Sequence, residues 1–119
     1  MQQLLSIMQQ LRQQCPWDQK QTPESLTKYA IEEAYEVEAA VRSGKVDDVR
    51  DELGDLLLQV VFQAQMYSEQ GAFDFQDVVQ AICDKLIRRH PHVFQAEQFA
   101  QHEQLRITIP EHALLLLHA

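Results

Sequence analysis

Apolar residues recur every three or four positions along most of residues 1–94, which is the spacing of amphipathic helices. Proline, glycine and capping residues divide this pattern into segments. The sequence therefore predicts four helices, over about residues 2–14, 23–43, 45–70 and 75–90. Beyond residue 94 the periodicity fades, so we expect one domain over residues 1–94 and a weakly helical or irregular tail over 95–119.

The predicted helix ends rest on residues with known capping preferences. Thr22 followed by Pro23 is typical of a helix start, and Gly44 is typical of a helix stop. Gly71 is expected to end the third helix and Asp74 to cap the fourth. With three Gly and four Pro in the whole chain, these signals favour an all-α fold.

The segment Cys15-Pro16-Trp17-Asp18 is predicted to be a loop, because a proline disfavours the α conformation in the residue before it. It carries the single tryptophan of the chain. Two interpretations of Trp17 stay open at this point. The indole either plugs the core or offers a platform on which a nucleobase stacks.

Two groups of acidic residues interrupt the apolar pattern. Glu33 occupies the apolar stripe of the second helix between Ala30 and Val37, where a helix built only for packing would carry Leu or Val. In the third helix, Asp55 lies inside a long apolar stretch and Glu52 lies at its edge. Burying these carboxylates is costly unless a cation neutralises them.

The spacing of the acidic residues places each group on one face of its helix. Residues three or four apart share a face, so Glu32 and Glu33 lie beside Glu36, and Glu52 lies beside Asp55. Two such helices packed side by side would direct four or five carboxylates into one space. Carboxylate oxygens suit Mg²⁺, Mn²⁺ or Ca²⁺, and the sequence therefore predicts a hard-metal site.

Two further patterns bear on partners. The third helix is apolar on nearly all sides between Leu53 and Phe62, which favours packing against a second subunit. We therefore expect a homodimer or homotetramer. The last turn of the fourth helix carries Lys85, Arg88 and Arg89, the densest basic patch in the chain. These cations either complement the helix dipole or contact phosphate.

Composition narrows the classes of partner. A net charge of −8 argues against a nucleic-acid polymer, and a phosphorylated ligand would need metal ions to approach the protein. The two cysteines are isolated, which indicates neither a zinc knuckle nor a disulfide framework. The apolar runs are too short to cross a membrane and the first residues lack the pattern of a signal peptide, so we expect a cytoplasmic protein.

Taken together, the motifs resemble the MazG-like nucleotide pyrophosphohydrolases, which belong to the all-α NTP pyrophosphohydrolases. The resemblance is to the N-terminal MazG-type domain and covers about residues 1–94. It implies a four-to-five-helix bundle completed by oligomerisation. The motifs that carry it are CPWD at 15–18, EExxE at 32–36, DELGDLLLQVVF at 51–62 with its ExxD, and KLIRRHPHVF at 85–94.

The resemblance also implies an activity. Members hydrolyse a nucleoside triphosphate to the monophosphate and pyrophosphate, by water attack at the α-phosphorus, with Mg²⁺ or alternatively Mn²⁺. The implied metal ligands are Glu33, Glu36, Glu52 and Asp55. Glu32 and Glu33 are the implied catalytic residues, Glu32 as a further ligand or as the base that orients water. The implied substrate contacts are Lys85, Arg88, Arg89, Trp17 and Lys20.

The chain departs from the family pattern in two places. Active relatives often carry a lysine one helical turn before the first acid of ExxD, where Asp48 stands here. Members of this type usually continue into a second homologous domain, which residues 95–119 do not resemble. An alternative is therefore a domain that turns over slowly or not at all and serves in metal or nucleotide binding, assembly or regulation.

Three unrelated interpretations compete with this one. The acids can simply solvate a non-catalytic helical module. A di-iron carboxylate bundle requires Glu-x-x-His pairs, and no glutamate here has a histidine three residues later. A zinc site at His90 and His92 has too few ligands, because Pro91 separates the pair and neither Cys nor another His is nearby in the sequence.

Overall fold

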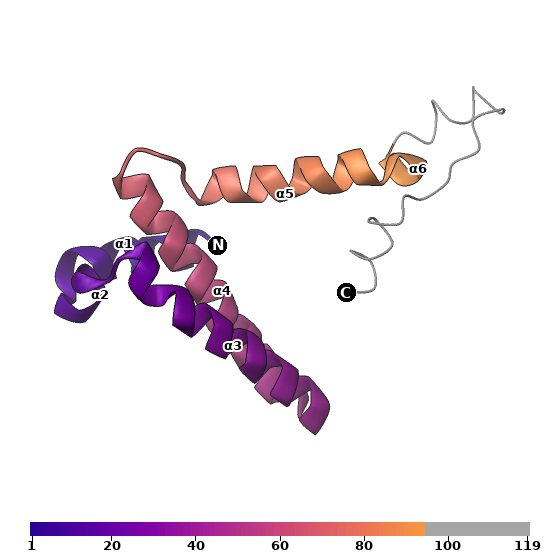
Figure 1. Ribbon diagram of the computed structural model, residues 1–119, viewed down its shortest axis with the longest axis horizontal. Helices are drawn as coiled ribbons and strands as arrows, with labels where there is room; N and C mark the ends of the chain where they lie inside the picture. Colours follow the sequence, from indigo (N-terminus) through magenta and orange to yellow (C-terminus); the bar gives the residue numbers. More distant parts are fainter. Residues whose placement is uncertain (95–119) are drawn as a thin grey trace. The chain divides into compact units, whose positions relative to one another are not determined.

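The computed structural model describes residues 1–94 and contains helices but no strand within them, which confirms the all-α class. The predicted tail lies outside the described residues. Two compact units divide the chain, Met1–Phe75 and a second that begins at Gln76. The helices, drawn in Figure 1, are α1 (Gln2–Gln14), α2 (Pro16–Lys20), α3 (Pro23–Ser43), α4 (Val46–Glu69), α5 (Phe75–Arg89) and α6 (Pro91–Phe94).

The ends of α3 follow the predicted capping chemistry. The Thr22 side chain accepts a hydrogen bond from the backbone N–H of Ser25, and the Ser25 hydroxyl accepts one from the backbone N–H of Thr22. This reciprocal pair satisfies two amides that the first turn of a helix leaves free. Gly44 ends the helix with φ 76°, a left-handed conformation that glycine adopts without strain.

The prediction of a loop at residues 15–18 is wrong, because Pro16–Lys20 forms the short helix α2. Cys15 is extended, as expected before a proline, and this makes it the N-cap of the new helix. Pro16 then occupies the first helical position, where its fixed φ is favourable and its missing N–H costs nothing. The proline that ends α1 therefore also starts α2.

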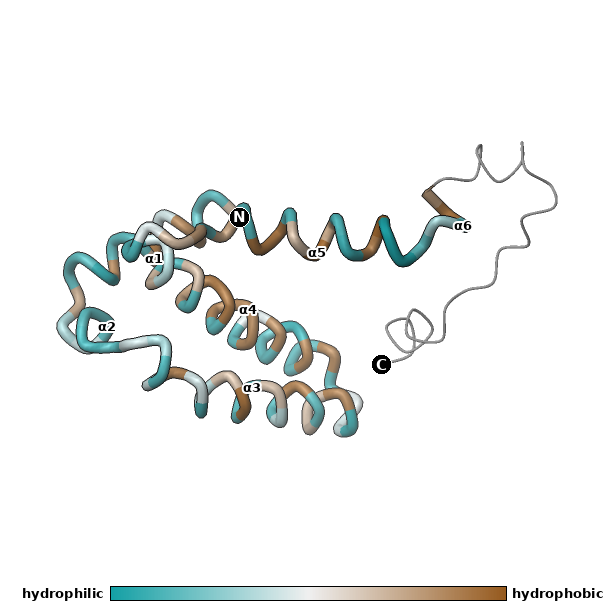
Figure 2. The backbone as a smooth tube through the Cα atoms, turned by 45° about the horizontal axis from the view of Figure 1, so that its top comes forward, coloured by the Kyte–Doolittle hydropathy of each residue, from teal (hydrophilic) through white to brown (hydrophobic). Residues whose placement is uncertain are grey.

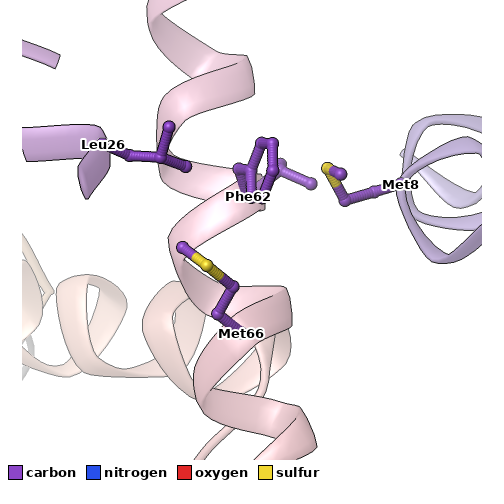
Figure 3. Close-up of a cluster of buried hydrophobic side chains, with 5 residues drawn as sticks. Met8, Leu26, Phe62 and Met66 are labelled. Atoms are coloured by element: carbon purple, nitrogen blue, oxygen red, sulfur yellow. The ribbon is translucent and has the colours of Figure 1, made fainter. Parts of the chain in front are cut away.

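In the first unit α3 and α4 lie side by side and antiparallel, and α1 packs across α4 (Figure 1). Their apolar faces meet in one core. Figure 3 shows Met8 of α1 and Leu26 of α3 approaching Phe62 and Met66 of α4. Met8, Leu26 and Val61 are each 1% exposed, so this end of the helix hairpin is the most tightly covered part of the unit.

Arg12 joins α1, α2 and α4 by hydrogen bonds. Its Nε and Nη2 donate to the two carboxylate oxygens of Glu69, at 2.9 and 2.6 Å. Its Nη1 donates to the backbone carbonyls of Asp18, at 2.6 Å, and of Gln21, at 3.3 Å. The guanidinium also lies 5.9 Å from the centre of the Phe62 ring. One side chain therefore fixes the N-terminal segment against the central helix.

Helix α5, apart from Phe75, belongs to the second unit and is amphipathic, with apolar and polar residues alternating along its length in Figure 2. The helical spacing of its apolar residues predicts an inward face made of Val78, Val79, Ile82, Leu86 and Ile87. The structure corrects this prediction, because no residue of Phe75–Arg89 is buried. Val78 and Val79 are half-buried. The remaining three, Ile82, Leu86 and Ile87, are exposed.

Candidate functional site

Three carboxylates from two helices meet in the first unit. Glu33 of α3 and Glu52 and Asp55 of α4 each offer an oxygen, and these oxygens lie within 4.8 Å of one another. The antiparallel hairpin brings them together although 19 and 22 residues separate Glu33 from the other two, counted as 52 − 33 and 55 − 33. The two acidic groups of the sequence therefore face one another across the helix pair.

Glu33 lies in the half-buried stripe of α3, as its sequence position predicts. Its neighbours on that stripe, Tyr29, Ala30 and Val37, are half-buried like Glu33 itself. Its Oε2 atom is buried and has no hydrogen-bond partner among residues 1–94. A buried carboxylate oxygen without a donor is unfavourable by a few kcal/mol, so this atom is placed to accept a ligand.

The charges of the cluster act on Glu52. Partial burial raises the pKa of the Glu52 carboxyl above its ordinary value, and the negative charges of Asp55, Glu33 and Glu36 raise the pKa further. A hydrogen bond with the Glu33 side chain acts in the same direction. The cluster thus favours taking up positive charge, which either a proton or a metal ion supplies.

The donor set fits a hard divalent cation. Mg²⁺ binds oxygen at about 2.0–2.1 Å, so ligand oxygens around one ion lie about 3 to 4 Å apart. Carboxylate oxygens within 4.8 Å need only small side-chain rotations to reach that spacing. Apart from the hydrogen bond between the Glu52 and Glu33 side chains, the buried Oε2 of Glu33 has no partner in the described chain, and this free acceptor is the observation that favours an ion.

The other two acids of EExxE lie at the edge of this cluster. Glu36 is exposed, and its charge contributes to the pKa of Glu52, so it is near the site without belonging to the group of converging oxygens. Glu32 is exposed on α3. The structure therefore brings together three of the four residues proposed as ligands, and leaves Glu32 and Glu36 accessible from solvent.

Trp17 is not a core plug, because its side chain is 53% exposed. Its ring meets the Tyr29 ring edge-on, with centroids 6.3 Å apart and planes at 70°. The Lys28 ammonium lies 5.1 Å from the Tyr29 ring centre, and Lys20 is exposed on the last turn of α2. Tyr29 precedes Glu33 by one helical turn, so an aromatic pair made of the exposed Trp17 and the half-buried Tyr29, with nearby cations, adjoins the acidic cluster.

The second unit carries the predicted basic residues on the last turn of α5. Lys85 and Arg88 are exposed and Arg89 is half-buried. His90 follows them, buried, with its Nδ1 2.6 Å from the Leu86 carbonyl oxygen, so Nδ1 carries the proton and donates. The rings of His90 and His92 lie 5.6 Å apart, and no third metal-binding side chain joins them within residues 1–94.

Sequence reasoning missed Gln59. This residue follows Asp55 by four positions and Glu52 by seven, which puts it on the same face of α4. Its Oε1 is buried and finds no hydrogen-bond donor in the described part of the chain. The signal was present in the sequence, since Gln59 is a polar residue inside the apolar run LGDLLLQVVF.

The fold and the site define a class: all-helical domains that carry a carboxylate cluster on an antiparallel helix pair. The chain belongs to the MazG nucleotide pyrophosphohydrolase domain family, whose family model matches residues 21–94. The match includes the helix pair and all five acidic residues identified above. Within residues 1–94, no helix is both long and apolar enough to cross a membrane.

Relatives and a solved structure agree with this assignment. The chain is 51% identical over 113 residues to a nucleoside triphosphate pyrophosphohydrolase of Escherichia coli, covering 87% of this chain and 43% of the relative. It is 55% identical over 93 residues to a nucleoside triphosphate pyrophosphohydrolase/pyrophosphatase MazG of Thermotoga maritima, covering 76% and 36% respectively. The chain therefore spans less than half the length of these curated relatives.

The crystal structure of a mazG-related protein from Thermotoga maritima has the same fold, with a TM-score of 0.70. It covers 89% of this chain and 100% of its own, at 24% sequence identity. At that identity the likeness concerns the arrangement of helices alone.

Proposed function

We propose that this chain is a divalent-metal-dependent nucleoside triphosphate pyrophosphohydrolase that converts a nucleoside triphosphate and water into the monophosphate and pyrophosphate. The observation that carries the proposal is the convergence of Glu33, Glu52 and Asp55 with an unsatisfied buried oxygen on Glu33. Family membership supports it, as do the printed names of the relatives.

The proposed metal is Mg²⁺, with Mn²⁺ as an alternative, held by Glu33, Glu52 and Asp55 and joined by Glu36. When bound, such a cation neutralises phosphate charge and polarises oxygen ligands. The protein's own part is to hold these carboxylates at fixed positions. Glu32, exposed on α3, is proposed either as a further ligand or as the base that orients the water attacking the α-phosphorus, as the family pattern implies.

Substrate contacts complete the proposal. Trp17 offers an exposed ring for base stacking and Lys20 a cation on the same short helix. Lys85, Arg88 and Arg89 are proposed to contact phosphate, because they concentrate positive charge in a chain of net charge −8. Their place on the C-terminal turn of α5 also suits them to the helix dipole, so both interpretations of these cations remain.

A homodimer or homotetramer is part of the proposal. Leu53, Leu57 and Val60 of α4 follow one another at helical spacing and are 49%, 38% and 40% exposed. The apolar face of α5 is exposed as well. Exposed apolar faces on two helices exceed what an isolated small domain normally leaves in water, so contact between copies is the arrangement we favour.

A second candidate function is metal and nucleotide binding without efficient turnover. Asp48 favours it, because this exposed acid in the first turn of α4 stands where active relatives often have a lysine. A carboxylate there repels phosphate instead of attracting it. The two candidates differ in product formation but share the metal site.

The first experiment measures pyrophosphate release from a panel of nucleoside triphosphates with and without Mg²⁺. We expect metal-dependent release that falls at least about 100-fold in Asp55→Asn and in Glu33→Gln, because each removes a charged ligand oxygen. Without metal, the same substitutions should raise the melting temperature, since they relieve repulsion within the cluster.

Glu38→Gln is the matched control, because Glu38 is an exposed acid of α3 whose side chain pairs with Arg42. It should retain activity. Folded protein that releases no pyrophosphate from any nucleotide would contradict the proposal. If that protein still binds Mg²⁺ through Asp55, the binding function remains.

A further inference from the structure

Gln59 occupies the position between the acidic cluster and the aromatic pair. The Nε2 of Gln63 donates to the Pro23 carbonyl at 2.9 Å, and Asp55 meets Glu33, so these two contacts fix the register of α3 against α4. Gln59 lies four residues from Asp55 and four from Gln63, about 6 Å along the helix from each. Its Cα atom therefore lies opposite residues 27–29 of α3. Side chains lean toward the N-terminus of their own helix, so in this antiparallel pair the Gln59 side chain leans toward Asp55 and the Tyr29 side chain leans away from Glu33.

The amide oxygen of Gln59 lacks a hydrogen-bond donor, which an apolar residue used only for packing would not need. Its Oε1 is buried and accepts no hydrogen bond from any described residue. Leaving a buried amide oxygen unpaired is unfavourable, and an apolar side chain of the same length would avoid the cost. The residue as a whole is only half-buried, so rotation of its terminal torsions can bring Oε1 to a ligand without moving α4.

The layout of the face follows the layout of a nucleotide. The carboxylates of Glu33, Glu52 and Asp55 are at one end, where metal and phosphates belong, and Tyr29 with Trp17 is at the other, where a base stacks. The group of a nucleotide that joins phosphates to base is the sugar. An amide oxygen at that level can accept a hydrogen bond from a sugar hydroxyl, since hydroxyl groups donate and carbonyl oxygens accept.

We propose that Gln59 positions the substrate by accepting a hydrogen bond from a hydroxyl of the nucleotide sugar. The proposal rests on the proposed function for the identity of the ligand, but not on turnover. It makes Gln59 a residue that determines sugar selectivity. The substitution Gln59→Leu removes the acceptor and keeps the apolar stem.

The experiment is calorimetric titration with nucleotides whose α,β-bridging oxygen is replaced by methylene, so that no cleavage is needed. Ribose, 2′-deoxy and 3′-deoxy forms of one such nucleotide are titrated in the presence of Mg²⁺. In the unsubstituted protein, one deoxy form should bind about tenfold more weakly than the ribose form, because it leaves Oε1 unpaired. In Gln59→Leu the ribose form should weaken to the level of that deoxy form, and their ratio should fall to about one.

Gln63→Leu is the matched control. Gln63 is the next glutamine on the same face, but its amide already donates to Pro23. The Gln63→Leu variant should keep the difference in affinity between the ribose and deoxy forms but should be less stable. The Gln59→Leu variant should bind both forms equally and should melt at or above the temperature of the unsubstituted protein. These opposite combinations of effects on affinity and stability distinguish a residue that binds the ligand from one that only supports the fold.

Three results would overturn the inference. They are an unchanged ratio in Gln59→Leu, equal affinity of the unsubstituted protein for all three sugars, and no binding of any analogue. Loss of the ratio in Gln59→Leu, together with an absence of pyrophosphate release, would support the role of Gln59 while rejecting the proposed activity. Pyrophosphate release by the protein, together with an unchanged affinity ratio in Gln59→Leu, would support the proposed activity and reject the role of Gln59.

Discussion

Arg12 is expected to contribute more to stability through backbone carbonyls than through its ion pair. The side chain of Arg12 is 14% exposed, while its partner Glu69 is 37% exposed. Solvent therefore weakens the ion pair, which we put at less than about 1 kcal/mol. The bond from Nη1 to the Asp18 carbonyl is different, because Asp18 is only 9% exposed. Without Arg12 this oxygen would keep only the 3.3 Å hydrogen bond from the backbone N–H of Gln21.

Arg12→Met keeps most of the side-chain stem and removes the guanidinium. Losing the charged donor to the Asp18 carbonyl should cost about 1–3 kcal/mol, and losing the Phe62 contact should cost about 0.5–1 kcal/mol. When the small contribution of the solvent-exposed ion pair is added, we expect a total loss of about 3 kcal/mol in the free energy of unfolding. Glu69→Gln removes only the charge of the pair and should cost less than about 1 kcal/mol.

Urea unfolding followed by the fluorescence of Trp17 measures both variants, since this is the single tryptophan of the chain. Equal m-values are required for the comparison, because a changed slope would indicate a different unfolded or native state. If Glu69→Gln destabilises as much as Arg12→Met, the ion pair and not the carbonyl contacts holds α1 and α2 to α4. The reasoning from burial would then be refuted.

Two further predictions concern pH and backbone conformation. The hydrogen bond from Arg12 holds the pKa of Glu69 below its ordinary value of 4.5, so the stability it adds is complete above pH 4.5 and disappears as pH falls through the lower folded pKa. Urea midpoints measured across that window should fall in the unsubstituted protein and stay flatter in Glu69→Gln; parallel curves would contradict the assignment. Gly44→Ala should lose about 1–2 kcal/mol, because φ is +76° there, whereas Gly54→Ala lies within α4 with nothing near its added methyl group and should gain up to about 1 kcal/mol. Changes of the same sign in the free energy of unfolding for both glycine variants would contradict this argument from backbone conformation.

The sequence predicted the four long helices closely because local signals determine their ends. Thr22 with Pro23, and Gly44 after the last apolar residue, each act within one helical turn, and the structure bears them out. The short helix α2 was missed for a local reason of the same kind. Pro16 was interpreted as a helix stop, although a proline suits the first position of a new helix equally well.

Burial was harder to predict, because it depends on what covers a face and not on the face itself. The apolar periodicity of α5 is real, yet Ile82 and Leu86 are 44% and 37% exposed. Trp17 was ambiguous for the same reason: a large aromatic ring suits a core, and its 53% exposure follows from how α2 docks beside Tyr29. Periodicity indicates which residues prefer burial, whereas the neighbouring elements decide whether they obtain it.

The acidic site could be predicted because it violates packing rules that sequence reveals. Glu33 in an apolar stripe is half-buried, as its position predicts, whereas Asp55, although it stands in an apolar run, is exposed. The structure shows oxygens of the two side chains meeting. Gln59 is a weaker signal in the sequence, because an amide carries no charge. Its buried Oε1 has no partner among the described residues, and this too is unfavourable.

Unsatisfied buried oxygens on both helices of the hairpin also explain why this face should respond to substitution in an unusual way. Replacing a residue that serves only the fold destabilises the protein, as expected for Gln63 with its hydrogen bond to the Pro23 carbonyl. Glu33 and Gln59 carry buried oxygens that no described residue satisfies, so their apolar or neutral replacements should stabilise the free protein. Stability gained together with ligand affinity lost is the result that distinguishes a preorganised site from an imperfect core.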